Sequence, residues 1–407
     1  DARMPQLLEK PQLLSRPQPQ QPASSSAASS TPAPPPPPPP QQQKSTGPRR
    51  LLNDAFDFLS DDANAALSDA SDFTVVGVLG AQGAGKSTLM SLLAGARFTN
   101  SSPSQLQEPP FAPQTTDTVL QAAHQTNGVE LFVTPERLLL LDTQPLLSPS
   151  VLLDLAKRDV AIPADVQTHE NLLELHSIRI ALLILSSCHL VLIAHDGQPD
   201  PLTLRTLRVA MMLRHRIPDL SVLAQATPAA SNAIIAAAAS SPSADENPPQ
   251  VIEYHPNVAF VFNNMPSEAF DPGQQATLKA ALHKLFATAS SSPASGPSQT
   301  AAATSTAAAD GGAAEEEGDA AENAAETGLS LYWLPFSGEA TCASHLGYRA
   351  EAESCRDELL ALKRRPFART ITEREWLRGA GRMWELIRRS ALLADYNKSL
   401  QKLHCYG

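Results

Sequence analysis

The chain has little of several residue types that mark other classes of protein. Aromatic residues make up 5 % of its 407 residues, and the four cysteines, Cys188, Cys342, Cys355 and Cys405, include no CxxC pair. This spacing argues against a disulfide framework and indicates a reducing compartment. Acidic residues outnumber basic ones by 42 to 31, and the formal net charge of −11 argues against nucleic-acid binding as the main activity.

A zinc site, a membrane span and a signal peptide are also disfavoured. The segment Cys342–Cys355 carries two cysteines and a histidine, but a fourth ligand at suitable spacing is missing. The longest apolar stretch, Ile178–Ala194, is interrupted by charged and polar side chains, whereas a membrane span needs about 20 mostly apolar residues. Residues 1–20 are polar and proline-rich. We therefore expect a soluble, cytoplasmic protein.

One stretch carries a specific motif. The apolar, β-branched run Val75–Leu79 predicts a strand buried on both faces, and Thr88–Leu93 contains good helix formers. Between them, Gly80–Ser87 reads GAQGAGKS and matches G-x-x-x-x-G-K-[ST]. Strand, loop and helix in this order are the context that a phosphate-binding loop requires.

In such a loop the glycines let backbone N–H groups point at an anion, and the following helix adds the positive end of its dipole. Lys86 is expected to reach the β- and γ-phosphates of a nucleotide, and the Ser87 hydroxyl to ligate Mg²⁺. The predicted nucleotide-binding residues of this loop are Gln82, Gly83, Ala84, Gly85, Lys86, Ser87 and Thr88.

Two further residues are candidates for the metal site. Thr126 lies just before the predicted strand Val129–Val133 and could ligate Mg²⁺, although an ordinary turn explains it equally well. The leucine-rich strand Arg137–Thr143 brings the Asp142 carboxylate to its end, where an acid holds Mg²⁺ through water in this class of fold. The alternative role of Asp142 is to cap the next loop.

The residues after Asp142 depart from the pattern of active GTP hydrolases, which usually read Asp-x-x-Gly followed by glutamine. Pro145 stands at the glycine and has no N–H to give the γ-phosphate. Leu146 stands at the glutamine and cannot orient a water molecule, while Gln144 is one or two places away. The sequence thus predicts binding without efficient turnover.

The base-reading motif is incomplete as well. Guanine readers of this fold carry Asn-Lys-x-Asp after the strand that corresponds to Asn257–Phe262. Only Asn263 matches, because Asn264 replaces the lysine and Pro266 the acid. Asn263 is kept as a predicted nucleotide contact, and the cofactor is either GTP/GDP or ATP/ADP, together with Mg²⁺.

Composition divides the chain into ordered and disordered parts. Residues 1–50 are predicted to be a disordered arm, rich in proline and glutamine, that serves as a spacer or as a ligand for a proline-binding module. Residues 51–397 are predicted to form an α/β domain of the P-loop, G-domain-like class, with a mostly parallel sheet and helices on both faces. Disordered insertions are expected at 224–249 and 288–328, and a tail at 398–407.

Two helices at the ends of this domain are predicted from periodicity. Leu51–Ala70 carries apolar residues at helical spacing and is expected to be an amphipathic helix. A capping box, Thr372–Glu375, begins a helix near the C-terminus. Its apolar stripe is expected to pack inside the domain and consists of Trp376, Ala380, Met383, Trp384 and Ile387.

Several of these sequence segments together resemble one family, subunit nine of the SMG factors. Members of this family contain a G domain. The segments are the strand–loop–helix unit, Gln125–Gly128, Leu141–Ser150, and the terminal Ile371–Trp376 with Ala394–Tyr396. The segment Asp142–Ser150 is the most specific, because it is unusual for a GTP hydrolase and usual for that family. The resemblance covers roughly 72–196, 256–263, 329–336 and 369–396.

The resemblance implies a function in nonsense-mediated mRNA decay. Members of the family pair with subunit eight, a second G-like protein, and the pair binds and regulates the phosphatidylinositol-3-kinase-related kinase of that pathway. No direct contact with nucleic acid or membrane is implied. The expected function is therefore a nucleotide-binding regulatory subunit rather than an enzyme, and the alternative is an active GTPase of the dynamin or guanylate-binding type.

Overall fold

The computed structural model describes residues 47–404 except for 100–104, 159, 161, 216, 241–253, 291–328 and 338–344. By its internal contacts the chain divides into two units, Asp1–Lys44 and Ser45–Gly407. The described residues belong to the second unit. Of the predicted arm at 1–50, residues 1–46 lie outside the described residues, whereas Arg49 and Arg50 belong to the first strand, Arg49–Leu52.

The described residues form one seven-stranded sheet with the order β1-β3-β4-β2-β5-β6-β7. Strand β3 is antiparallel to both β1 and β4, and the pairs from β4 through β2, β5 and β6 to β7 are parallel. This arrangement is the predicted α/β class. The strands are β1 (Arg49–Leu52), β2 (Thr74–Gly80), β3 (Val129–Val133), β4 (Leu138–Thr143), β5 (Leu190–Asp196), β6 (Asn257–Met265) and β7 (Leu329–Pro335).

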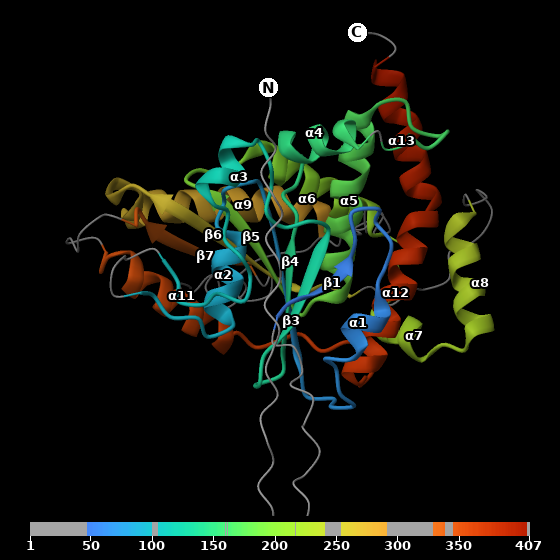
Figure 1. Ribbon diagram of the computed structural model, residues 1–407, viewed down its shortest axis with the longest axis horizontal. Helices are drawn as coiled ribbons and strands as arrows, with labels where there is room; N and C mark the ends of the chain where they lie inside the picture. Colours follow the sequence, from blue (N-terminus) through green and yellow to red (C-terminus); the bar gives the residue numbers. More distant parts are fainter. Residues whose placement is uncertain are drawn as a thin grey trace, which may run out of the picture. The chain divides into compact units, whose positions relative to one another are not determined.

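Helices cover both faces of this sheet (Figure 1). They are α1 (Ser60–Asn64), α2 (Lys86–Leu93), α3 (Thr116–Leu120), α4 (Pro149–Lys157), α5 (His169–Ser187), α6 (Pro201–Leu213), α7 (Leu220–Gln225), α8 (Pro228–Ala239), the 3-10 turn η1 (Ser267–Phe270), α9 (Pro272–Ser290), α11 (Tyr348–Ala361), α12 (Glu373–Arg389) and α13 (Ala391–His404).

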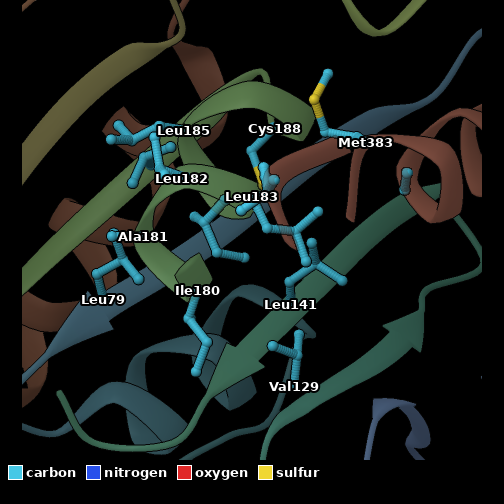
Figure 2. Packing of buried hydrophobic residues seen from close by; sticks show 14 of the residues in the cluster. Leu79, Val129, Leu141, Ile180, Ala181, Leu182, Leu183, Leu185, Cys188 and Met383 are labelled. Atoms are coloured by element: carbon cyan, nitrogen blue, oxygen red, sulfur yellow. The ribbon is translucent and has the colours of Figure 1, made fainter. Parts of the chain in front are cut away.

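Strand β2 lies at the centre of the sheet and is buried on both faces, as its sequence predicts. Val76 and Val78 point to the side covered by α2 and α11, whereas Val75 and Leu79 point to the side covered by α5 and α12. Figure 2 shows the second side, where leucines of α5 and Met383 of α12 meet side chains of the sheet. Because β2 is clamped from both sides, the loop that follows it starts from a fixed position.

The predicted helix Leu51–Ala70 is wrong. Leu51 and Leu52 belong to β1 and are both almost fully buried, and the chain then turns so that Phe58 pairs with Leu52. The turn forms because Asn53 Oδ1 accepts hydrogen bonds from the N–H groups of Ala55 and Asp57, at 2.9 and 2.8 Å. Only the five residues of α1 are helical within this segment.

Two predictions of disorder also need correction. Within the predicted insertion 224–249, α8 forms a helix because Thr227 caps it, Pro228 begins it and alanines fill it. Residues 241–249 lie outside the described residues. Helix α9 extends to Ser290, three residues into the predicted insertion 288–328, whose remainder lies outside the described residues. The predicted tail at 398–407 is helical as far as His404, the end of α13.

The apolar stripe of α12 packs inside the domain, as predicted. Thr372 and Glu375 form the reciprocal capping box. Trp376 and Trp384 are buried, and their indole N–H groups donate to backbone carbonyls of Ser187 at 2.8 Å and Phe56 at 3.0 Å. Each indole therefore buries a large apolar area without leaving its polar atom unpaired.

Within the described part of the chain, no helix is both long enough and apolar enough to cross a membrane. The same residues contain no group of three or more histidine, cysteine or acidic side chains that could hold a metal. Cys342, which the zinc alternative requires, lies outside them. Cys188 and Cys355 are buried free thiols, and burial raises the pKa of both.

Candidate functional site

The loop between β2 and α2 has the shape of an anion-binding turn. Gly83 and Gly85 adopt φ angles of +82° and +85°, which residues with a side chain rarely adopt. A Cβ on Gly80 would lie 2.3 Å from the carbonyl oxygen of Ala194 on the neighbouring strand. The glycines of the motif are thus required by backbone conformation and by packing, and they place the start of α2 over the end of the sheet.

Asn263 lies directly against this loop. A Cβ on Gly85 would lie 2.5 Å from Asn263 Nδ2, so the third glycine of the motif makes room for this carboxamide. Asn263 is nearly buried, and its Oδ1 accepts a hydrogen bond from the N–H of Asn264 at 3.1 Å. The predicted contact of Asn263 with a nucleotide remains a prediction, whereas its contact with the loop is observed.

Lys86 is almost completely buried at the first position of α2. Its ammonium donates to the carbonyl oxygen of Ala81 at 2.8 Å. Loss of solvent lowers the pKa of Lys86 to about 8, although the nearby Asp142 carboxylate acts in the opposite direction. Binding of a negatively charged group beside Lys86 would therefore stabilise the charged form of this buried side chain.

The three predicted metal ligands converge beside Lys86. Ser87 Oγ donates to Asp142 Oδ2 at 2.7 Å, Thr126 Oγ1 donates to the same oxygen at 2.9 Å, and the two hydroxyl oxygens are 3.3 Å apart. Metal binding by Thr126 stays a prediction, whereas its hydrogen bond to Asp142 is part of the structure. Burial raises the pKa of Asp142, while Lys86 and the two hydroxyls act to lower it.

This donor set fits Mg²⁺. It consists of oxygen atoms, which are the ligands that hard divalent cations prefer. The second carboxylate oxygen, Asp142 Oδ1, is buried without a hydrogen-bond partner among the described residues. Ser87 and Thr126 would hold the ion directly and Asp142 through water, and the ion would offset the energetic cost of the buried carboxylate.

A cavity of about 190 Å³ opens above these groups. Several of its walls were not predicted from the sequence; they come from the polar segment before Thr126 and from the end of β4. The lining residues are Gln82, Gly83, Gly85, Lys86, Ser87, Thr88, Pro113, Gln114, His124, Gln125, Thr126, Thr143 and Pro145. Of the predicted loop residues, Ala84 is fully buried and does not line the cavity.

The segment after β4 offers the cavity little that would assist hydrolysis. Pro145 lines the cavity without an N–H group. Gln144 is buried, and its Oε1 accepts from the N–H of Gly128 at 2.9 Å, so its carboxamide is engaged with the β3 side of the site. Leu146 is buried, and its N–H donates to the carbonyl oxygen of Gly80 at 3.1 Å.

Comparison with known proteins identifies the family. The chain is 29 % identical over 350 residues to the nonsense-mediated mRNA decay factor SMG9 of Xenopus laevis, a match that covers 84 % of this chain and 64 % of the relative. The SMG9 of Salmo salar is 28 % identical over 359 residues, with 83 % and 64 % covered. The chain belongs to the SMG9 family.

A third relative, SMG9 of Caenorhabditis elegans, is 32 % identical over 165 residues, which cover 40 % of each chain. No family model matches the chain. The chain spans about 64 % of the length of the vertebrate SMG9 proteins it matches.

The base-reading region of this SMG9-family chain differs from that of a guanine reader in its contacts. Asn264, which stands in place of the expected lysine, has a φ of +53°. Its Nδ2 donates to Asp196 Oδ1 at the end of β5, at 2.7 Å. Pro266 caps the 3-10 turn η1 and offers no carboxylate for a base. The residues at these two positions therefore provide no group that selects guanine over adenine.

Nucleotide affinity is expected to fall as the pH rises above about 8. The pKa of Lys86 is lowered to about 8 without a bound anion, and bound phosphates would raise it again. Between these two pKa values binding takes up a proton, so affinity drops by up to about tenfold per pH unit, whereas below pH 8 Lys86 is charged in both states and adds no dependence. Calorimetry at pH 8.5 in buffers of different ionisation enthalpy should detect this uptake, and its absence would contradict a contact between Lys86 and the phosphates.

Proposed function

We propose that this chain is a nucleotide-binding regulatory subunit of the nonsense-mediated mRNA decay machinery that hydrolyses its nucleotide little or not at all. The role in decay follows from membership of the SMG9 family, whose relatives carry that function in their names. The nucleotide is GTP or ATP, or the corresponding diphosphate, bound with Mg²⁺. It acts as a structural ligand that stabilises the folded state by mass action.

One observation carries this proposal. The groups that would bind a polyphosphate and Mg²⁺ meet beside one cavity: the loop Gly80–Ser87 with its buried Lys86, and the Thr126 and Asp142 oxygens. Pro145, which stands in place of the glycine that contacts the γ-phosphate in GTP hydrolases, also lines this cavity. Binding groups are thus present together, while the N–H donor and the water-orienting side chain of a hydrolase are replaced.

Turnover assays test the enzymatic part of the proposal. Phosphate release from GTP and from ATP, measured with Mg²⁺ at low and at high protein concentration, should stay at the level of the Lys86→Met variant. A substantial rate that this variant abolishes would contradict the proposal. A rate that also increases with protein concentration would support the alternative, a GTPase of the dynamin or guanylate-binding type that is stimulated by dimerisation.

The partners proposed for the chain are SMG family subunit eight and the phosphatidylinositol-3-kinase-related kinase of the pathway. This part rests on family membership. Co-expression should yield a stable complex of this chain with subunit eight, and adding that complex should change the rate at which the kinase phosphorylates the decay helicase. Absence of both effects would contradict the assignment to the kinase complex.

A further inference from the structure

The side chain of Gln82 connects two segments that flank the cavity. Its Nε2 donates to the carbonyl oxygen of Ala123 at 3.0 Å. Its Oε1 accepts from Ser148 Oγ at 2.6 Å and from Ser150 Oγ at 2.7 Å. Since Gln82 belongs to the loop between β2 and α2, one carboxamide joins that loop, the start of α4 and the segment before Thr126.

The α4 end of this connection is held firmly by other contacts. Ser148 and Ser150 are buried at the capped start of α4. Just before them, the N–H of Leu146 donates to the carbonyl of Gly80, and the N–H of Leu147 donates to Ser177 Oγ of α5 at 3.0 Å. The hydroxyls that bind Gln82 therefore have fixed positions.

The other end is packed weakly. Helix α3, which precedes Ala123, contains no buried residue, and Val119 and Leu120 are 59 % and 79 % exposed. The hydrogen bond from Gln114 Nε2 to Ala123, at 3.1 Å, closes this segment on itself rather than tying it to the loop. A segment with so little apolar burial depends on its polar contacts for its position.

We propose that Gln82 is a latch that holds the α3 segment against the phosphate-binding loop whether or not a nucleotide is bound. Every atom of the latch belongs to the protein, so its hydrogen bonds need no phosphate. In a nucleotide switch, by contrast, the corresponding segment is ordered by contacts with the γ-phosphate and its metal and is released on hydrolysis. The latch lets this chain present the same surface beside the cavity when it is loaded and when it is empty.

Hydrogen exchange measured by mass spectrometry tests the latch directly. The reporting amides are those of Val119, Gln121 and Ala123, whose N–H groups donate to carbonyls within the segment. In the unaltered chain their exchange should be the same with and without nucleotide and Mg²⁺. In Gln82→Ala, exchange without nucleotide should be about tenfold faster or more, because the tie to the loop is lost.

Two further variants separate the latch from a general loss of structure. Gln82→Glu keeps an acceptor for Ser148 and Ser150 but cannot donate to Ala123, so only the α3 segment should exchange faster. The start of α4, which other contacts hold in place, should keep its exchange rates in Gln82→Ala and in Gln114→Ala, the variant that removes the other hydrogen bond to Ala123.

The latch would be overturned by unchanged exchange of the α3 segment in both Gln82 variants. It would also be overturned if this segment in the unaltered chain became strongly protected only on adding nucleotide. The comparison without nucleotide does not depend on the proposed function. The comparison with nucleotide does, and binding measured in the same samples distinguishes failure of the proposed function from failure of the latch.

Discussion

Lys86→Met is expected to lower the affinity for GTP or ATP at least about 100-fold, which corresponds to about 2.7 kcal/mol of binding free energy. Lys86 is buried at the foot of the cavity with its pKa lowered by loss of solvent. Bound phosphates would stabilise the desolvated ammonium, for which the Asp142 carboxylate compensates only in part, and methionine has no charge and no donor. Isothermal titration calorimetry with Mg²⁺ measures the change.

The same substitution is expected to leave the fold intact. Methionine has a side chain of similar length. It removes the desolvation cost of the buried ammonium, and it also removes the attraction of that ammonium to the Asp142 carboxylate and its hydrogen bond to Ala81. Because these effects oppose each other, the melting temperature of Lys86→Met without nucleotide should stay close to that of the unaltered chain. Lys402→Met, at an exposed position of α13, is the matched control and should change neither property. Unchanged affinity in Lys86→Met would show that the nucleotide binds elsewhere.

Glu373→Ala is expected to reduce the free energy of unfolding by about 3 kcal/mol or more. Glu373 is fully buried at the start of α12 and forms an ion pair with Arg137. Its carboxylate also accepts from the N–H and the hydroxyl of Ser68, at 2.7 and 3.1 Å. Removing it leaves the Ser68 N–H without its acceptor, and it leaves the Arg137 guanidinium with a hydrogen bond to Ser68 Oγ but without its carboxylate. Because the Arg137 side chain is 30 % exposed, we place the loss at the lower end of the range for buried pairs.

Urea denaturation of the two variants Glu373→Ala and Arg374→Ala checks this prediction. Arg374 is the adjacent residue and pairs with Asp69 at 2.8 Å, but both side chains are largely exposed. Its replacement should therefore change the free energy of unfolding by no more than about 1 kcal/mol. Equal effects of the two substitutions would mean that the buried pair does not anchor α12 to the β3–β4 turn.

The features that sequence analysis predicted correctly are those set by local chemistry. The glycine spacing of Gly80–Ser87 admits few backbone conformations, and its strand and helix flanks are predicted from the same stretch. Asp142 and Thr126 lie in hydrogen-bond contact because each is beside an end of neighbouring strands, β4 and β3, while their predicted role as metal ligands stays a prediction. The capping box of α12 and its apolar stripe are likewise local signals.

The features that were missed depend on contacts between distant parts of the chain. The spacing of apolar residues in Leu51–Ala70 suits a helix, but pairing with β3 and the Asn53 turn favour a strand. Alanine content alone did not separate α8 from a disordered insertion, because its order also depends on packing against α12. The place of Gln82 in the loop predicts a nucleotide contact and gives no sign of its side-chain contacts, which are with residues about 40 and 70 positions away.

The most direct test of a site that binds a polyphosphate without cleaving it is to identify the nucleotide that stays bound. The purified chain would be incubated with Mg²⁺ and GTP or ATP, separated from free nucleotide, denatured after increasing times, and the released nucleotide identified by mass spectrometry. We predict close to one nucleotide per chain, still a triphosphate at late times, and none bound to Lys86→Met. Conversion of the bound nucleotide to diphosphate, or no bound nucleotide at all, would contradict this account.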